Sequence, residues 1–379
     1  MTIQGKNARL SRRDFLRLAT AGVVGFGATI SFAPKGYAVQ PDILYQGEVF
    51  DARGATLRVA EWGGFWEDVM RERALNQFEK DFNCRIQYDA GWPWFPKFVA
   101  GGVNRPPFDI TNWNMPEMFK TAGVMRGLLA PQDQMTANVP NTAELWDFAK
   151  VTGVGITKLF SQYGFVYRTD MIDEPFPSKF EDFWQDRFAD RRGTYITSNT
   201  LQHVLFMTAA ATFGSGPTDL EAGIQAMRDA MPLKISDFTG NMQILVERGE
   251  VVIANQHDGE GLLQKSKGLP VDWFYWDFKP ILSQTTTISQ NIPTTQKRLA
   301  YALANIFAGA RYQTEAGGDV FLRPTNKNAQ VKPELAELGV RNTAKGLEGL
   351  WIPPWDWWNA NEQEIVRRVN DIYAGGSGR

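Results

Sequence analysis

The first part of the sequence alternates short apolar strands with an amphipathic helix. Residues 56–60 form a short β-type run, which a Gly-Gly pair at 63–64 interrupts. Apolar side chains then recur every four residues, as on one face of a helix, at Trp66, Met70, Ala74, Phe78 and Phe82. Apolar and polar residues alternate through 84–89, and a third β-type segment covers 108–111. This βαβ order predicts a parallel sheet with helices on its faces.

A second α/β block follows a turn-rich middle. Its predicted elements are a strand at 163–167, the start of a helix at 180–184, a strand at 194–196, a helix at 201–213 and a strand at 251–254. The polar segment 283–291 then precedes a predicted long helix at 295–312, and a last helix runs to about Tyr373. In open α/β sheets, ligands collect beyond the carboxyl ends of strands. The segments in such positions are 61–66, 112–114, 198–203 and 255–259.

The N-terminal segment carries an export signature. Residues 11–17 are Ser-Arg-Arg-Asp-Phe-Leu-Arg, the pattern of a twin-arginine signal, and an uncharged run from 18 to 33 follows. Lys35 and small residues at 36 and 38 surround a predicted cleavage point near Val39. We therefore predict a twin-arginine signal peptide over 1–38 and a periplasmic mature protein. The uncharged run is too short and too rich in Gly, Ala and Thr for a good membrane span, so we expect no stable membrane insertion.

Composition narrows the classes of function. The chain beyond residue 38 is longer than one hydrophobic core usually organises, so we expect two lobes. Residues 1–38 contain six of the 40 basic residues but one of the 42 acids, so the mature chain is acidic, which argues against a nucleic acid partner. Cys84 is the only cysteine, and His203 and His257 are the only histidines. We therefore expect no disulfide, no metal, no cofactor and no catalytic residues.

Several segments, taken in order, resemble those of one family. They are Val-Ala-Glu-Trp-Gly-Gly at 59–64, Phe-Asp-Ile at 108–110, Tyr-Gly-Phe-Val-Tyr at 163–167 and Arg-Gly-Glu-Val-Val-Ile-Ala at 248–254. Over nearly all of the mature chain they are similar to the extracellular solute-binding proteins of ABC importers, in the group that includes the polyamine receptors. The resemblance implies a two-lobed α/β periplasmic binding protein fold of type II, with a ligand cleft between lobes that close over a solute.

The same resemblance implies an organisation and a role. Lobe 1 would comprise 44–155 plus 281–345, lobe 2 would comprise 156–280, and a C-terminal aromatic segment and helix would cover 346–379. The tryptophans within 351–358 are expected to dock this last segment rather than to contact solute. The protein would be a monomeric, non-catalytic receptor that captures a small polar organic solute and delivers it to the permease subunits of an ABC importer.

The candidate ligand contacts lie mainly at the predicted strand ends. They are Glu61, Trp62, Gly63, Gly64, Trp66, Trp113, Asn114, Asn199, His203, His257 and Asp258. Glu61 and Asp258 could pair with an amine on which tryptophans stack. Exposed amides of Gly63 and Gly64 at a helix start could instead hold an anion, or the two glycines could simply form a tight turn.

The predicted ligand loops depart from the polyamine receptors. Those receptors carry a Trp before an Asn or Asp and a Gly, where this chain has His257, and the segment 198–203 lacks the acids that they present to ligand amines. A desolvated ammonium needs a carboxylate or an aromatic face, so a polyamine, another organic amine, a carboxylate and a phosphonate all stay open. An exported hydrolase using Glu61 and Asp258 is a further alternative, although the sequence contains no GxSxG, HExxH or GxxxxGK[ST] motif.

Overall fold

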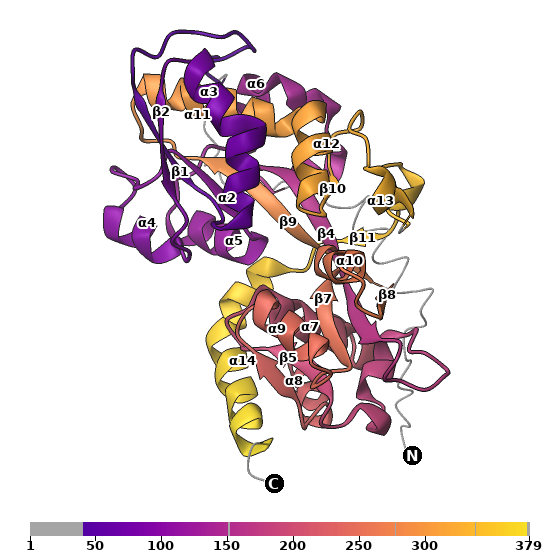
Figure 1. The fold of residues 1–379 in the computed structure, drawn as a ribbon. Helices are drawn as coiled ribbons and strands as arrows, with labels where there is room; N and C mark the ends of the chain where they lie inside the picture. The colour runs from indigo at the N-terminus through magenta and orange to yellow at the C-terminus, as the bar shows by residue number, and fades with distance from the viewer. Residues whose placement is uncertain (1–40, 151, 277, 338, 377–379) are drawn as a thin grey trace, which may run out of the picture.

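The computed structural model describes residues 41–150, 152–276, 278–337 and 339–376, so the predicted signal peptide lies outside the described residues. The described chain forms two α/β bodies, one above the other in Figure 1. We call the upper body lobe 1 and the lower body lobe 2. Hydrogen-bonded strands run through both in the order β2 (Arg85–Asp89), β1 (Thr56–Ala60), β3 (Ile110–Trp113), β9 (Lys279–Ile288), β4 (Ile156–Arg168), β7 (Ile253–His257), β5 (Arg192–Tyr195) and β6 (Lys234–Ser236).

Lobe 1 contains the βαβ unit that the sequence predicts. Strand β1 pairs in parallel with β2 and with β3. The helix between β1 and β2 is continuous but has three segments: α2 (Phe65–Met70), the π-helical turn η1 (Arg71–Leu75) and α3 (Asn76–Asp81). Its side chains Met70, Ala74 and Phe78 are buried, which confirms the predicted apolar face. The remaining helices are α4 (Phe95–Gly101), α5 (Met115–Val124), α6 (Gln132–Asn138), α11 (Thr294–Ala308), α12 (Ala310–Asp319), α13 (Pro333–Glu337) and the 3₁₀ turns Pro140–Glu144, Asp147–Lys150 and Lys345–Leu347.

The long helix predicted at 295–312 is two helices in the structure. Helix α11 ends at Ala308 because Gly309 has extended backbone angles, with φ −74° and ψ 144°. Helix α12 then starts at once and packs against α2 and η1. The apolar pattern continues through the break, so the sequence periodicity alone does not reveal it.

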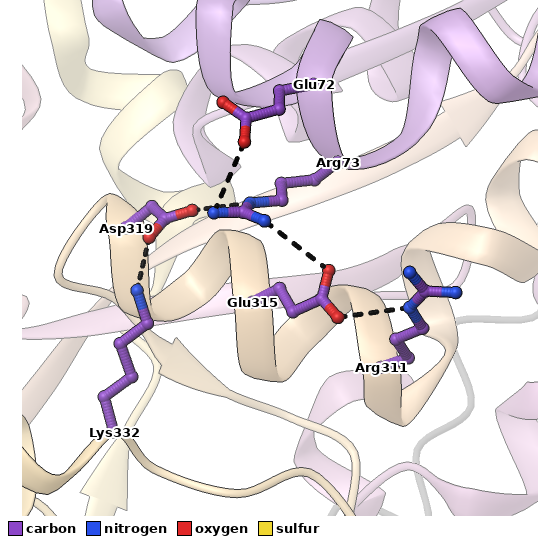
Figure 2. A network of polar contacts seen from close by, with 6 residues as sticks. All are labelled: Glu72, Arg73, Arg311, Glu315, Asp319 and Lys332. Carbon is purple, nitrogen blue, oxygen red and sulfur yellow. Dashed lines mark hydrogen bonds and ion pairs between the residues drawn. The ribbon is translucent and has the colours of Figure 1, made fainter.

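A network of charged side chains joins this second helix to the first helix of the chain (Figure 2). The Arg73 Nε lies 2.8 Å from an Asp319 carboxylate oxygen, and its Nη1 lies 3.9 Å from Glu315. Lys332 contacts the other Asp319 oxygen, and Arg311 contacts Glu315. These side chains are partly exposed, so each pair contributes at most about 1 kcal/mol. The network therefore adds to the packing of α12 on α2 and η1 rather than replacing it.

Lobe 2 is a second, smaller α/β unit. Strand β5 pairs in parallel with β6 and β7, and the surrounding helices are α7 (Thr200–Phe213), α8 (Leu220–Asp229), α9 (Thr239–Glu247), α10 (Asp258–Ser266) and the 3₁₀ turns Phe180–Trp184 and Asp186–Phe188. The core is aromatic, with the rings of Phe165 and Phe183 stacked 4.7 Å apart and Trp276 packed against Phe165.

Two strands connect the lobes. All thirteen residues of β4 are buried; residues 156–162 pair with β9, and 163–168 pair with β7 and with β8 (Val271–Tyr275). Two short strands, β10 (Arg323–Pro324) and β11 (Leu350–Trp351), pair with β4 and β9. The polar segment predicted before the long helix is in fact most of β9. Its Ser and Thr side chains are buried, and two of them bond to neighbouring strands: the Thr285 hydroxyl lies 3.0 Å from that of Thr157, and the Thr287 hydroxyl accepts from the Trp113 indole N–H.

The C-terminal helix α14 (Trp355–Gly376) contacts both lobes (Figure 1). It packs on α8 of lobe 2 and on α5 of lobe 1, where the Lys120 ammonium lies 2.6 Å from Glu362. Trp355 and Trp358 are buried in the lobe 2 core. The expectation that this tryptophan cluster docks the C-terminal segment is therefore confirmed. Within the described residues, no helix combines the length and apolar character that crossing a membrane requires.

Candidate functional site

The carboxyl ends of strands from both lobes approach each other where β4 and β9 cross between them. Trp113, the last residue of β3, pairs with Thr285, whereas His257, the last residue of β7, pairs with Tyr163. Between these two levels lie residues 158–162 of β4 and 281–284 of β9, which we call the crossing segments. The turns after β1, β3, β5 and β7 therefore face this interlobe region, where ligands bind in α/β folds.

Glu61, at the end of β1, already has a charged partner. Its side chain is 2 % exposed and accepts a hydrogen bond from the Lys158 ammonium, which is fully buried in the crossing segment. Burial raises the pKa of Glu61 and lowers the pKa of Lys158, and each charge opposes the shift of the other. The Lys158 ammonium also lies 4.3 Å above the Phe307 ring. In this structure Lys158 therefore pairs with the charge of Glu61, and a contact of Glu61 with a solute amine stays a prediction.

Asp258 has a similar position in lobe 2. It begins α10, and its carboxylate lies 2.6 Å from the Arg323 guanidinium of β10. The same carboxylate accepts hydrogen bonds from the backbone N–H of Gln162 at 3.1 Å and from the Tyr275 hydroxyl at 3.2 Å. Asp258 therefore links α10 to β4 and β10. Its charge is thus paired with Arg323 in this structure, and a contact of Asp258 with a solute stays a prediction.

The two carboxylates also fail the geometry of a hydrolase. A paired-carboxylate mechanism needs an acid and a base that face one substrate bond. Glu61 and Asp258 are each buried against a different basic side chain, Lys158 and Arg323. In the described parts of the chain, no group of three or more His, Cys, Asp or Glu side chains is arranged to hold a metal ion.

The predicted aromatic contacts have different environments. Trp113 is fully buried, its indole N–H donates to Thr287 at 2.7 Å, and its ring stacks on Phe98. Trp113 therefore belongs to the core of lobe 1 in this structure, and its predicted contact with solute stays a prediction. Trp62 is half-buried, and its indole N–H donates to Gln284 of the crossing segment at 2.5 Å. Trp66 is also half-buried, on the first turn of α2.

The turn after β1 is exposed, and the structure explains why glycines occupy both positions 63 and 64. Gly64 has φ 63° and ψ −138°, a conformation that side chains disfavour. A Cβ atom on Gly63 would approach the Cβ of Ala90 to 2.7 Å. These demands account for both glycines without a ligand. Asn114 starts α5, and its side-chain oxygen is buried without a partner among the described residues.

In lobe 2, two candidates have structural partners. The Asn199 side chain caps α7 by accepting from the Leu201 N–H at 2.9 Å. His203 is 5 % exposed, its Nε2 lies 2.8 Å from the Thr197 carbonyl, and its ring stacks on Trp358 at 4.2 Å. Burial lowers the pKa of His203 to about 4. The His203 ring thus packs against α14 in this structure, and its predicted approach to the solute stays a prediction.

His257 has a neighbour that sequence reasoning missed. Its side chain is 12 % exposed, with Nε2 3.4 Å from the Glu260 carboxylate and Nδ1 buried without a partner in the described chain. The buried hydroxyls of Tyr163 and Tyr195 and the amide of Gln256 are also unpartnered there. The sequence did contain one indication that Glu260 lies beside His257. Glu260 follows His257 by three residues, on the first turn of the helix after β7, and side chains at this spacing are neighbours on a helix.

The depressed pKa of His203 predicts a pH-dependent stability. Because the unfolded histidine titrates near 6.5 and the folded one near 4, the unfolded state binds more protons between these values. Stability is therefore lost as pH falls from 6.5 towards 4, by about 3 kcal/mol from this residue. Urea unfolding across this range should be less pH-dependent in His203→Gln, which keeps a donor for Thr197. Parallel profiles for the two proteins would contradict this assignment.

The contacts of Asp258 predict that its replacement strongly lowers the free energy of unfolding. Asp258→Ala leaves the Arg323 guanidinium buried without its carboxylate, which costs about 3–5 kcal/mol of unfolding free energy. Glu250→Ala removes a half-exposed acid at the opposite end of lobe 2 and should change stability by less than about 0.5 kcal/mol. Chemical denaturation compares the two variants; equal midpoints would show that the Asp258–Arg323 pair has no structural role.

Comparison with solved structures supports the fold. An ABC transporter structure from Clostridium perfringens matches with a TM-score of 0.70 and 22% identity, covering 84% of this chain and 99% of that one. An ABC transporter substrate-binding protein from Bradyrhizobium japonicum matches with a TM-score of 0.69 and 15% identity, covering 84% of this chain and 99% of that one. A spermidine/putrescine substrate-binding protein from Streptococcus pneumoniae matches with a TM-score of 0.65 and 15% identity, covering 84% of this chain and 100% of that one. No family model and no curated protein matches the sequence. The chain therefore has the two-lobed mixed α/β fold of solute-binding proteins.

Proposed function

We propose that this protein is a non-catalytic receptor that captures a small polar organic solute between its lobes and delivers it to an ABC importer. The observation that carries this proposal is a set of buried polar atoms beside the crossing segments that have no partner within the described chain. They belong to Ser161, Gln162, Tyr163, Tyr195, Gln256 and His257. Buried polar groups without partners are costly, and these lie on β4, on β7 and at the end of β5, beside the region where the lobes meet, which supports a polar ligand there.

The fold supports this role. Two lobes joined by β4 and β9 can change their relative angle with small backbone changes, and a solute that contacts both lobes stabilises the closed arrangement. One protein of similar fold is described as spermidine/putrescine-binding, which favours an organic amine as solute. An anionic solute at the amides of Gly63 and Gly64 is the alternative for the same receptor.

Compartment and partners follow from this role. The twin-arginine sequence at 11–17 supports export to the periplasm with folding before translocation. The importer's permease subunits would receive the solute from a monomeric receptor. We assign the lobes as 44–155 plus 281–345 and 156–280, with residues 346–379 as a C-terminal segment.

The receptor function predicts binding without turnover. Native mass spectrometry of the purified mature protein should detect one retained small molecule, and isothermal titration with that compound should show a single site. Trp62→Ala should weaken its affinity by about tenfold, because the half-buried indole borders the interlobe region. Phe213→Ala, which removes an exposed aromatic side chain at the far end of α7, is the matched control and should bind normally.

Two results would count against the receptor. Chemical conversion of the retained compound by the pure protein would indicate an enzyme. Equal loss of affinity in Trp62→Ala and Phe213→Ala would mean that the solute does not bind beside Trp62.

A further inference from the structure

We propose that Glu260, together with His257 and Tyr195, determines the charge of the solute: a compound with one cationic amine, held by the Glu260 carboxylate of lobe 2. This inference rests on the receptor function proposed above and names the class of its solute. It differs from the expectation from sequence, which assigned the amine to Glu61 and Asp258.

Three acidic side chains near the interlobe region differ in whether a basic side chain already pairs with them. Glu61, Asp258 and Glu260 lie in the turns after β1 and β7. Glu61 is paired with Lys158 and Asp258 with Arg323. The ion-pair partner of Glu260 is His257, which is charged only when protonated. Of these three acids, Glu260 is the one without a Lys or Arg contact in the described chain.

The Glu260 side chain is ionised although it is mostly buried. It is 18 % exposed. Burial raises its pKa, but the hydrogen bond and charge interaction with His257, a hydrogen bond from Thr239 and the more distant charge of Lys267 together outweigh this effect, and the pKa lies below its ordinary value. A carboxylate with so little exposure and no Lys or Arg in ion-pair contact among the described residues gains from a cation that replaces lost water. An ammonium group, with three donors, meets this need.

The neighbouring groups are suited to the same ligand. The Tyr195 hydroxyl is buried without a partner in the described chain, and the charge of Glu260 contributes, after burial, to raising the pKa of that hydroxyl. Tyr195 is the last residue of β5, which pairs in parallel with β7, so it lies at the same sheet edge as His257 at the end of β7. His257 presents a second unpartnered atom, its Nδ1. A hydroxyl and an imidazole nitrogen can both accept from an ammonium, whereas a solute carboxylate would face the negative charge of Glu260.

The side chains of lobe 1 near the crossing segments favour a solute that has only one cationic group. The acid that could hold a second ammonium there, Glu61, is neutralised by Lys158. What lobe 1 offers near the crossing segment is the half-buried ring of Trp62, held by Gln284. This surface suits an uncharged part of the solute better than a second charge. A monoamine therefore fits the site better than a diamine of the same length.

The test uses the whole mature protein and three sets of compounds with matched carbon skeletons: monoamines, terminal diamines and monocarboxylates of three to six carbons. Isothermal titration should detect binding of monoamines, no tighter binding of diamines, and no binding of carboxylates. Glu260→Gln, which keeps the size of the side chain, should weaken monoamine affinity by about 10- to 100-fold. Glu250→Gln, at the other end of β7, should bind within about twofold of the wild type.

Different failures have different meanings. Unchanged monoamine affinity in Glu260→Gln, or preferential binding of carboxylates, would overturn the role of Glu260 and leave the receptor function intact. Tighter binding of every diamine would overturn the single-cation assignment. If no compound binds and no solute is retained on purification, the receptor function itself fails. If Glu260→Gln unfolds, Glu260→Asp is the second variant, because it keeps the negative charge but places the carboxylate one carbon closer to the backbone. This variant should still weaken monoamine binding. Full affinity in Glu260→Asp would overturn the proposal.

Discussion

The continuous burial of strand β4 is the constraint on which the rest of the structure depends. Its first half completes the sheet of lobe 1 beside β9, and its second half completes the sheet of lobe 2 beside β7 and β8. A strand that is buried at every position normally carries apolar residues. Here the middle of the strand contains Lys158, Ser161 and Gln162, because this stretch passes between the lobes. Of these side chains, Lys158 is paired with Glu61, whereas the Ser161 hydroxyl and the Gln162 side-chain N–H group have no partner among the described residues.

Buried charges are the main consequence of this arrangement. Lys158 on β4 is stabilised by Glu61, and Arg323 on β10, next to β4, is stabilised by Asp258. Removing two charges from water is expensive, and the attraction within a buried pair roughly offsets this cost, so such pairs specify an arrangement more than they add stability. They join the turn after β1 and the first turn of α10 to the strands between the lobes. They also remove two carboxylates from the set that a solute can use.

The C-terminal helix adds a second connection between the lobes. It buries Trp358 against His203 in lobe 2 and reaches α5 of lobe 1 through the Lys120–Glu362 ion pair. Met115 of α5 lies in the same buried apolar cluster as Trp355 and Trp358, so the contact with lobe 1 is partly apolar as well. In lobe 2, α14 also forms an ion pair between Arg368 and Glu221 of α8. Helix α14 therefore contacts both lobes through apolar and polar side chains.

The sequence by itself determined the order and type of most elements. Apolar spacing placed the first strand and the face of the first helix, and the ordered motifs indicated a two-lobed α/β fold, because local periodicity reflects which face of an element is buried. The sequence could not show that β9 is a strand, since its Ser and Thr residues look like a loop until β3 and β4 surround them. Nor could it show which acids are free. Whether Glu61, Asp258 or Glu260 offers its charge depends on the basic side chains that approach from other strands, and only the tertiary structure brings Lys158 to one, Arg323 to the second and neither to the third.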